Sequence, residues 1–218
     1  MNIAIVGYGK MGRLVDRLAA ERGHNVATKV DDSESITAEN FKGIDAAIDF
    51  SIPSAVVGNI ERIAALGVNI VEGTTAWQQH IPHVRELVER AGIGLVWSPN
   101  FSVGVSAFMK MVNAAAKLMS EEPEYEAWAW EIHHSAKKDA PSGTLLKLVD
   151  EMRSAGYTAK VDVASSRAGA IPGTHEIGFD SGADTITLRH TARNREGFAL
   201  GAIKAAEWIV GKKGFYER

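Results

Sequence analysis

The stretch "NIAIVGYGKMG", residues 2–12, decides how the first half of the chain folds. The segment 2–6 is short, mostly apolar and partly β-branched, which predicts a buried strand that glycines bring to an end. Apolar residues then recur at spacings of three and four between residues 11 and 19, which predicts a helix. Between the two elements lies a G-x-G-x-x-G pattern made of Gly7, Gly9 and Gly12. A glycine pattern in this position is typical of a turn that binds the pyrophosphate of a dinucleotide.

Each of these glycines has a physical reason to be there if the turn binds a dinucleotide. Gly7 permits the tight turn, Gly9 lets the pyrophosphate approach backbone N–H groups, and Gly12 lets the helix pack closely on the strand. An acidic residue about 20 residues further on should accept hydrogen bonds from the adenosine ribose. Asp31 has this place and favours NADH, although Lys29 nearby leaves room for NADPH. The alternative is a glycine-rich turn beside surface acids.

The first hundred residues alternate between strand-like and helix-like segments. Further strands are expected at 24–30, 44–50, 68–73 and 93–97, and further helices at 53–66 and 77–91. Such alternation builds a parallel sheet covered by helices, and ligands bind at the carboxyl ends of its strands. Two loops at such ends, 72–77 and 98–102, offer Thr74, Thr75 and Asn100 to a nicotinamide or its ribose. Both could equally be ordinary loops.

The pattern changes after residue 102. Helices are expected at 103–119, 142–154 and 199–211, and strands at 125–134, 159–166, 174–181 and 184–192. Consecutive strands without helices between them indicate an antiparallel or mixed sheet. We therefore predict an α/β chain, with a doubly wound Rossmann-type domain followed by a smaller α+β domain that has a mixed sheet.

The composition argues against several classes of function. The chain has 218 residues, of which 45% are hydrophobic and 23% charged, the balance of a globular protein. Its net charge of −3 gives no reason to expect binding to nucleic acid or to a membrane surface. It has no cysteine, which excludes disulfides, thiolate nucleophiles and cysteine-based metal sites, and we expect no metal. Neither a membrane-spanning run nor a leader is expected, so we predict a cytoplasmic protein.

A second informative stretch is "EIHHSAKKDAPSGT", residues 131–144. His133 and His134 end a strand and point to opposite sides, so one of them can face a given pocket and exchange protons near neutral pH. Lys137 supplies a cation or an acid. Residues 142–144 should begin a helix, where hydroxyl and free N–H groups bind anions. The stretch thus combines a proton donor, a cation and a carboxylate cradle, and the alternative is a solvated basic loop with an ordinary helix cap.

Seven segments together resemble one known family. They are "HHSAKKDAPSGT", "GYGKMG", "IDFS", "EGTT", "PNFSVGV", "RAGAIPGTHEIGF" and "HTARNREGFALGA". This set is similar to the dihydrodipicolinate reductases, also called 4-hydroxy-tetrahydrodipicolinate reductases, over nearly the whole chain. The resemblance implies a reductase of the diaminopimelate route to lysine. Such an enzyme passes a hydride from NADH or NADPH to a cyclic unsaturated dicarboxylate and forms tetrahydrodipicolinate.

The resemblance also implies roles for single residues. His133 becomes the proton donor or acceptor, and Lys137 becomes the second proton-transfer group. Arg195 could add a bidentate contact to a substrate carboxylate or be a surface arginine. The other implied substrate contacts are His134, Ser142, Gly143 and Thr144. The implied cofactor contacts are Gly7, Tyr8, Gly9, Lys10, Met11, Gly12, Asp31, Gly73, Thr74, Thr75, Ser98, Pro99, Asn100 and Phe101.

The family architecture further implies how the chain is divided. Residues 1–102 would bind the dinucleotide, residues 196–218 would return to this domain, and residues 103–195 would bind substrate and assemble a homotetramer. Trp128 and Trp130 suit a subunit interface or a core. The chain is short, and its glycine turn is one residue shorter than in many members. The preference between NADH and NADPH therefore stays open.

Other polar residues of these stretches are expected to have structural roles. Lys138 should be solvated, Asp139 should hold its loop, and His175 and His190 should be structural. Two further functions remain open, namely a non-catalytic dinucleotide-sensing protein and a related amino-acid dehydrogenase. A sensor has little need for His133 and Lys137 together with the Pro-Ser-Gly-Thr turn, and a related dehydrogenase would share the fold without this signature.

Overall fold

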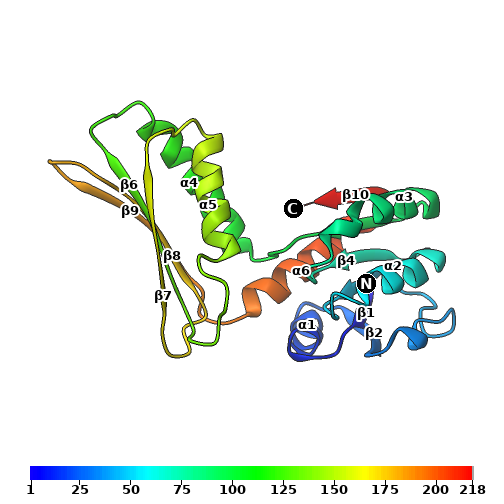
Figure 1. The fold of residues 1–218 in the computed structure, drawn as a ribbon. Helices are drawn as coiled ribbons and strands as arrows, with labels where there is room; N and C mark the ends of the chain where they lie inside the picture. Colours follow the sequence, from blue (N-terminus) through cyan, green and yellow to red (C-terminus); the bar gives the residue numbers. More distant parts are fainter. Residues whose placement is uncertain (218) are drawn as a thin grey trace. The chain divides into compact units, whose positions relative to one another are not determined.

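The computed structural model describes residues 1–217, which form two compact units (Figure 1). Unit 1 contains residues 1–102 and the chain from residue 196 onward, and unit 2 contains Val103–Arg195. Each unit has its own sheet, so the chain has the predicted α/β class with a second, mixed-sheet unit. Within residues 1–217, none of the helices combines the length and the apolar character that crossing a membrane requires.

Unit 1 is built on a six-stranded parallel sheet with the order β10-β5-β4-β3-β1-β2. From β1 the chain moves to β2 on one side, and then to β3, β4 and β5 on the other. The topological switch point therefore lies at the carboxyl end of β1, where the glycine turn begins. The strands are β1 (Asn2–Val6), β2 (Asn25–Val30), β3 (Ala46–Asp49), β4 (Asn69–Glu72), β5 (Gly94–Trp97) and β10 (Gly214–Glu217).

Four helices cover the two faces of this sheet. Alternate residues of β1 belong to different cores, because successive side chains of a strand point to opposite faces. Ile3 and Ile5 pack in the core that includes α1 and α6, and Ala4 and Val6 pack in the core that includes α2 and α3. Both faces of the strands are thus apolar, as a parallel sheet between helix layers requires. The helices are α1 (Lys10–Glu21), α2 (Val56–Ala65), α3 (Ile81–Ala91) and α6 (Glu196–Ile209).

Four elements of unit 1 differ by three residues or more from the sequence prediction. Helix α3 begins at Ile81 rather than at residue 77, because a separate 3₁₀ turn, Gln78–His80, precedes it. Helix α2 begins at Val56 rather than at residue 53, because a turn closed by a hydrogen bond from Ala55 N to Ile52 O precedes it. Helix α6 begins at Glu196, three residues earlier than expected. Strand β10 is not among the expected strands. It has four residues, too few to show a period, and pairs with β5 at the edge of the sheet.

Unit 2 contains a four-stranded mixed sheet with the order β7-β6-β8-β9. Only β6 and β7 pair in parallel, and the other neighbours are antiparallel. Helices α4 (Val103–Met119) and α5 (Gly143–Ser154) pack on one face, where Ala127 and Ala129 of β6 join a common core with both helices (Figure 1). The strands are β6 (Glu126–His133), β7 (Val161–Arg167), β8 (Thr174–Asp180) and β9 (Thr185–Thr191).

The opposite face of this sheet carries two tryptophans that alternate with the buried alanines of β6. The ring of Trp128 lies over Gly178, where an added Cβ would come within 2.0 Å of the ring. Trp130 donates from Nε1 to Ser166 Oγ at 3.2 Å, and the guanidinium of Arg189 lies 5.9 Å from its ring centroid. Both tryptophans are half-buried, and they lie on the face opposite α4 and α5 because they alternate with Ala127 and Ala129 of the helix-covered core.

Candidate active site

The glycine turn between β1 and α1 is tightly packed at two of its glycines and open at the third. Gly7 has φ +81°, and a Cβ there would lie 2.6 Å from Phe50 O. A Cβ on Gly12 would lie 2.3 Å from Gly7 O, so only glycine lets α1 pack this closely. A Cβ on Gly9, in contrast, would meet no atom of residues 1–217 within 4 Å. The open space at Gly9 fits a pyrophosphate that approaches the amino end of α1.

Asp31 follows β2 and is linked to the glycine turn, because its carboxylate accepts a hydrogen bond from Tyr8 N–H. The Tyr8 hydroxyl donates to Asp16, which also pairs with Lys29 Nζ at 2.7 Å. The cationic groups of Arg13 and Lys29 lie 4.9 and 5.2 Å from the centroid of the Tyr8 ring. A carboxylate suited to a ribose 2′-OH and two cations suited to a 2′-phosphate therefore surround Tyr8.

The loop after β4 is fixed by buried hydrogen bonds at Thr74. Its N–H donates to Glu72 Oε1 at 2.7 Å, and its carbonyl accepts from the indole Nε1 atoms of Trp77 and Trp97 at 2.9 and 3.1 Å. Thr74 is buried, whereas Thr75 is exposed. Of the two threonines expected at the cofactor, Thr75 is thus the one whose side chain a ligand can reach without a change in the loop.

The loop after β5 is held by its own polar groups. Ser98 Oγ donates to Asn100 O at 2.9 Å, and Asn100 Oδ1 accepts from Ser102 N at 2.9 Å. Phe101 is buried, and its carbonyl lies so close to α6 that a Cβ on Gly201 would be 1.6 Å away. The loop is therefore packed firmly on α6. Of the remaining expected cofactor residues, Lys10 and Pro99 are exposed, and Met11 and Gly73 are half-buried.

In unit 2, His133 lies at the end of β6 with 8% of its surface exposed. Its Nδ1 is 3.3 Å from Glu131 Oε2, although the two atoms are not aligned for a hydrogen bond. A Cβ on Gly173 would lie 2.8 Å from Nε2, and the ring meets His175 edge-on with centroids 5.0 Å apart. Burial lowers the pKa of His133, which the Glu131 carboxylate opposes and the Lys137 cation reinforces. The imidazole is therefore neutral at pH 7 and can accept a proton.

Glu131 lies at the centre of this cluster and is fully buried. Its Oε1 accepts hydrogen bonds from Ser142 N at 2.8 Å, Ser165 Oγ at 3.0 Å and Arg167 Nη2 at 2.9 Å. Its Oε2 accepts from Ser142 Oγ and lies 3.5 Å from His175 Nε2. Burial by itself raises the pKa of Glu131, but the hydrogen bonds from Ser142 and Arg167 outweigh it and lower the pKa to about 2. Glu131 is therefore a carboxylate at neutral pH.

The turn at residues 142–144 begins α5, as its sequence predicts. Ser142 is the N-cap, and its Oγ accepts a hydrogen bond from Leu145 N at 3.2 Å. Ser142 also donates its N–H and its hydroxyl to the carboxylate of Glu131. These two donors at the amino end of α5 are therefore already bound to an anion of the protein itself. Gly143 is exposed and Thr144 half-buried, so a substrate can reach them directly. A substrate contact of Ser142, which is 2% exposed, stays a prediction.

Lys137 pairs with Asp139 in the loop between β6 and α5. Its Nζ donates to both carboxylate oxygens of Asp139, at 2.7 and 2.8 Å. The carbonyl of Asp139 accepts from Arg167 Nη2, the same nitrogen that binds Glu131. Asp139 therefore ties the loop of Lys137 to the buried cluster. Of the other expected residues, His134 is half-buried, Lys138 is exposed, and Arg195 is exposed at the end of unit 2.

Comparison with known proteins gives the family. The model of the N-terminal part of dihydrodipicolinate reductase matches residues 1–101, and the model of its C-terminal part matches residues 104–218. The chain belongs to the dihydrodipicolinate reductase family. The predicted family is thus confirmed, and with it the class of NAD(P)H-dependent oxidoreductases.

Curated relatives and a solved structure agree with this membership. The chain is 34% identical to the 4-hydroxy-tetrahydrodipicolinate reductase of Christiangramia forsetii, over 99% of this chain and 95% of the relative. It is also 34% identical to the reductase of the same name from Archaeoglobus fulgidus, over 99% and 97%. A dipicolinate-bound dihydrodipicolinate reductase from Paenisporosarcina sp. TG-14 has the same fold, with TM-score 0.82, 22% identity and coverage of 100% and 97%.

Three members of the buried cluster are not among the site residues predicted from the sequence. Arg167 and His175 belong to "RAGAIPGTHEIGF", a segment that contributes to the family resemblance, yet His175 is expected there only as a structural residue. Glu131 begins the stretch that contains His133. Its position two residues before His133 places both side chains on the same face of β6, and a charge on a buried face requires a partner. This alternation is the signal that could have identified Glu131.

Glu131, His133 and His175 also have the residue types of a metal site, with ligand atoms all within 4.8 Å of one another. The Arg167 guanidinium, 2.9 Å from the same carboxylate, already supplies the compensating positive charge. Both oxygens of Glu131 further accept hydrogen bonds from Ser142. These contacts fit an arginine–carboxylate pair better than a bound divalent cation, which the nearby guanidinium would repel.

Proposed function

We propose that the chain catalyses the NAD(P)H-dependent reduction of 4-hydroxy-tetrahydrodipicolinate to tetrahydrodipicolinate in the diaminopimelate route of lysine biosynthesis. The observation that carries the proposal is the match of both family regions to residues 1–101 and 104–218. The names of the curated relatives support the same reaction. The open glycine turn and the cluster around His133 supply, in separate units, the binding and proton-transfer groups that such a reaction needs.

The cofactor, when bound, supplies a hydride. Gly7, Gly9 and Gly12 would hold its pyrophosphate against backbone N–H groups, and Asp31 would accept a hydrogen bond from its ribose. The link between Asp31 and Tyr8 N–H supports this role, because it keeps the carboxylate beside the turn. NADH and NADPH are both compatible with the groups around Tyr8. We place the nicotinamide end at the loops after β4 and β5, which contribute Gly73, Thr74, Thr75, Ser98, Pro99, Asn100 and Phe101.

His133 and Lys137 would move the protons of the reaction. A neutral His133 beside the Glu131 carboxylate can take up a proton and hold it as an imidazolium, which the carboxylate stabilises. Lys137 is three-quarters buried and paired with Asp139, so it offers a positioned ammonium group. The substrate that accepts the hydride also needs a proton. Loss of either residue should therefore slow the reaction, since acid–base groups contribute about 100-fold or more to rates.

A small dicarboxylate needs donors and cations around it. Gly143 and Thr144 present the accessible part of the helix end, where backbone N–H groups face an anion. His134, Ser142 and Arg195 are the further substrate contacts that we propose. The description of the Paenisporosarcina structure as dipicolinate-bound supports a dicarboxylate of this size.

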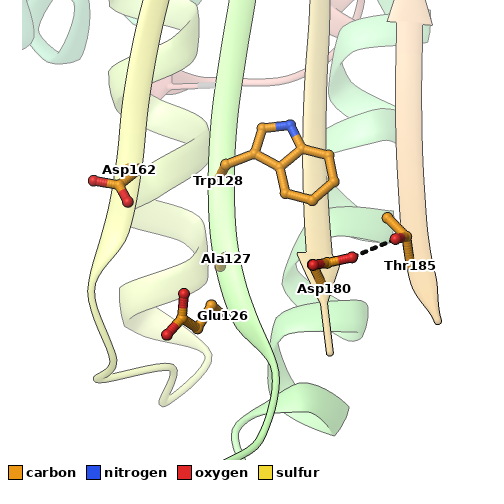
Figure 2. Close-up of a pocket in the computed structure, with 6 residues that line it drawn as sticks. All are labelled: Glu126, Ala127, Trp128, Asp162, Asp180 and Thr185. Carbon is orange, nitrogen blue, oxygen red and sulfur yellow. Dashed lines mark hydrogen bonds between the residues drawn. The ribbon is translucent and has the colours of Figure 1, made fainter. Parts of the chain in front are cut away.

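The sheet face of unit 2 opposite α4 and α5 supports the proposed homotetramer. Trp128, Trp130 and Arg189 lie there, and tryptophan and arginine are enriched at protein interfaces. At one end of this face lies a hollow of about 430 Å³ (Figure 2), lined by Glu126, Ala127, Trp128, Asp162, Asp180 and Thr185. It begins seven residues before His133 on an extended strand, roughly 20 Å away, so we assign it to the assembly surface rather than to the reaction. A cytoplasmic location likewise stays part of the proposal.

The direct test is a coupled assay with the full chain. A synthase supplies the cyclic dicarboxylate, and NADH or NADPH oxidation is followed by absorbance. We expect oxidation only when the synthase product is present. We further expect His133→Ala and Lys137→Ala each to lower kcat by about 100-fold or more. Lys138→Ala is the matched control, because this lysine is exposed beside Lys137 and should leave kcat unchanged.

The alternatives give different results in the same assay. A dinucleotide-sensing protein would bind NADH with no turnover of the synthase product. A related amino-acid dehydrogenase would reduce NAD⁺ with an amino acid such as aspartate and ignore the synthase product. Wild-type rates in both His133→Ala and Lys137→Ala would contradict the assignment of the proton-transfer groups.

A further inference from the structure

Glu131 makes polar contacts with several of the groups that surround His133. Glu131 and His133 share the helix-covered face of β6, because they are two residues apart on one strand. The carboxylate touches groups from three other segments, namely Ser142 at the start of α5, Arg167 on β7 and His175 on β8. One buried anion thus joins three of the segments that surround His133 in unit 2.

We propose that Glu131 is a positioning residue for the reaction, which holds His133 and the turn at residues 142–144 in their working places. The proposal rests on the proposed function, because it takes His133 as the proton-transfer group. Carboxylates that face the inner nitrogen of a catalytic imidazole fix its orientation and stabilise its protonated form. Here Oε2 lies 3.3 Å from Nδ1, so the carboxylate is close enough to act on the imidazolium when it forms.

The opposite side of the His133 ring is confined by Gly173. A Cβ at this position would lie 2.8 Å from Nε2 and 3.0 Å from Cδ2. The edge contact with His175 limits the ring on a third side. His133 therefore has little freedom to rotate away from Glu131, which is what a group that moves a proton to one substrate atom requires.

The same carboxylate sets the accessible end of α5. Ser142 gives both its N–H and its hydroxyl to Glu131, so the orientation of Gly143 and Thr144 depends on this contact. Arg167 balances the charge of Glu131 and also donates to Asp139 O, next to the Asp139 side chain that holds Lys137. Loss of the carboxylate would thus disturb the histidine, the helix end and the lysine loop together.

The proposal predicts a specific pattern for Glu131→Gln. This variant keeps the size and an acceptor oxygen but removes the negative charge. We expect kcat to fall by about 100-fold, within the range of acid–base contributions, while the Kd for NADH stays unchanged because the glycine turn lies in unit 1. Glu121→Gln is the matched control, since it makes the same change at an exposed position of the same unit, away from the cluster. It should leave both values unchanged.

The titration of His133 separates positioning from mere folding. Besides Glu131, the groups that face this histidine are Lys137, Arg167, Asp139 and His175. Glu131 is the strongest of those that favour the protonated ring, so Glu131→Gln should move the His133 titration, followed by NMR in the full chain, to lower pH. An unchanged titration together with wild-type kcat would overturn the proposal.

Two further results keep this test decisive. If Glu131→Gln does not fold, Gly173→Ala adds a Cβ against the other side of His133 without changing the carboxylate. Gly156→Ala is its control, because Gly156 also has a positive φ but has open space around it. A folded Gly173→Ala with wild-type kcat would contradict a confined His133. If wild-type protein gives no turnover but its His133 titration still depends on Glu131, the proposed function fails and the contact with Glu131 stands.

Discussion

Two glutamates, one in each unit, have no exposed surface, yet their carboxyl groups behave oppositely. Glu131 in unit 2 has its pKa lowered to about 2, whereas burial raises the pKa of Glu72 in unit 1 well above its usual value. Glu131 accepts hydrogen bonds from two serines and an arginine. Glu72 accepts one from Thr74 N, and within residues 1–217 its Oε2 has no hydrogen-bond partner.

A neighbouring acid further raises the pKa of Glu72. Glu72 is paired in register with Asp49 on β3, a second buried acid whose negative charge disfavours ionisation of Glu72. Asp49 has the better partners of the two, with Ser51 N at 2.7 Å and Asn59 Nδ2 at 2.9 Å. The fold therefore favours the protonated form of Glu72 next to the loop after β4, and the charged form of Glu131 beside His133. Burial sets the cost of a charge, and the donors around it decide whether the charge persists.

The largest effect should follow from removing the well-partnered carboxylate. Glu131→Ala leaves the guanidinium of Arg167 and the polar groups of Ser142 buried without their acceptor. Breaking a buried pair in this way costs about 3–5 kcal/mol. Urea unfolding of the full chain measures this loss, with Glu121→Ala as the exposed control in the same unit. A loss below about 1 kcal/mol would show that Glu131 is not held by its partners as described.

A smaller effect should appear in acid. Unfolded Glu131 takes up its proton near pH 4.5, and folded Glu131 near pH 2, so its stabilising contribution is complete above pH 4.5. It is lost as the pH falls from 4.5 towards 2, and the gap corresponds to about 3 kcal/mol. The difference in unfolding free energy between wild type and Glu131→Gln should therefore shrink across this range. Glu207→Gln, at a surface ion pair with Arg22, should show less than about 1 kcal/mol.

The smallest effect should come from Glu72 and have the opposite sign. Below pH 4.5 Glu72 is neutral in both the folded and the unfolded chain. As the pH rises, the unfolded chain ionises first, so stability falls until the folded pKa is passed. Glu72→Gln should lie within about 1 kcal/mol of wild type at pH 5 and lose less stability between pH 5 and pH 8. A steeper loss in the variant would mean that Glu72 is ionised in the fold.

The sequence predicts the fold well where the apolar periodicity of an element agrees with the residues that begin or end it. The apolar strand at residues 2–6 and the glycines after it lead directly to β1 and α1, and the helix expected at 103–119 has these bounds in the structure. Strand β10 is missed because four residues show no period. The start of α2 is misplaced because Pro53 suits both a first helical turn and the preceding turn.

Some residues of the candidate site can likewise be predicted from the sequence, and others cannot. The glycine pattern and residues 131–144 are visible because their chemistry is local in sequence. Arg167 and His175 reach Glu131 only through the pairing of β6 with β7 and β8, and no local pattern reports such pairing. The same limit applies to Glu72, whose neighbour Asp49 comes from the adjacent strand. Which carboxyls are charged therefore depends on contacts between segments distant in the chain.

The most direct test of this account is a pH titration of carboxyl carbons in the full chain labelled with ¹³C-glutamate. Loss of one signal in Glu131→Gln and of another in Glu72→Gln assigns the two groups. The account predicts that the Glu131 signal titrates far below the other glutamates, near pH 2, and that the Glu72 signal titrates above them. Titration of both groups on the same side of the ordinary glutamate range would contradict it.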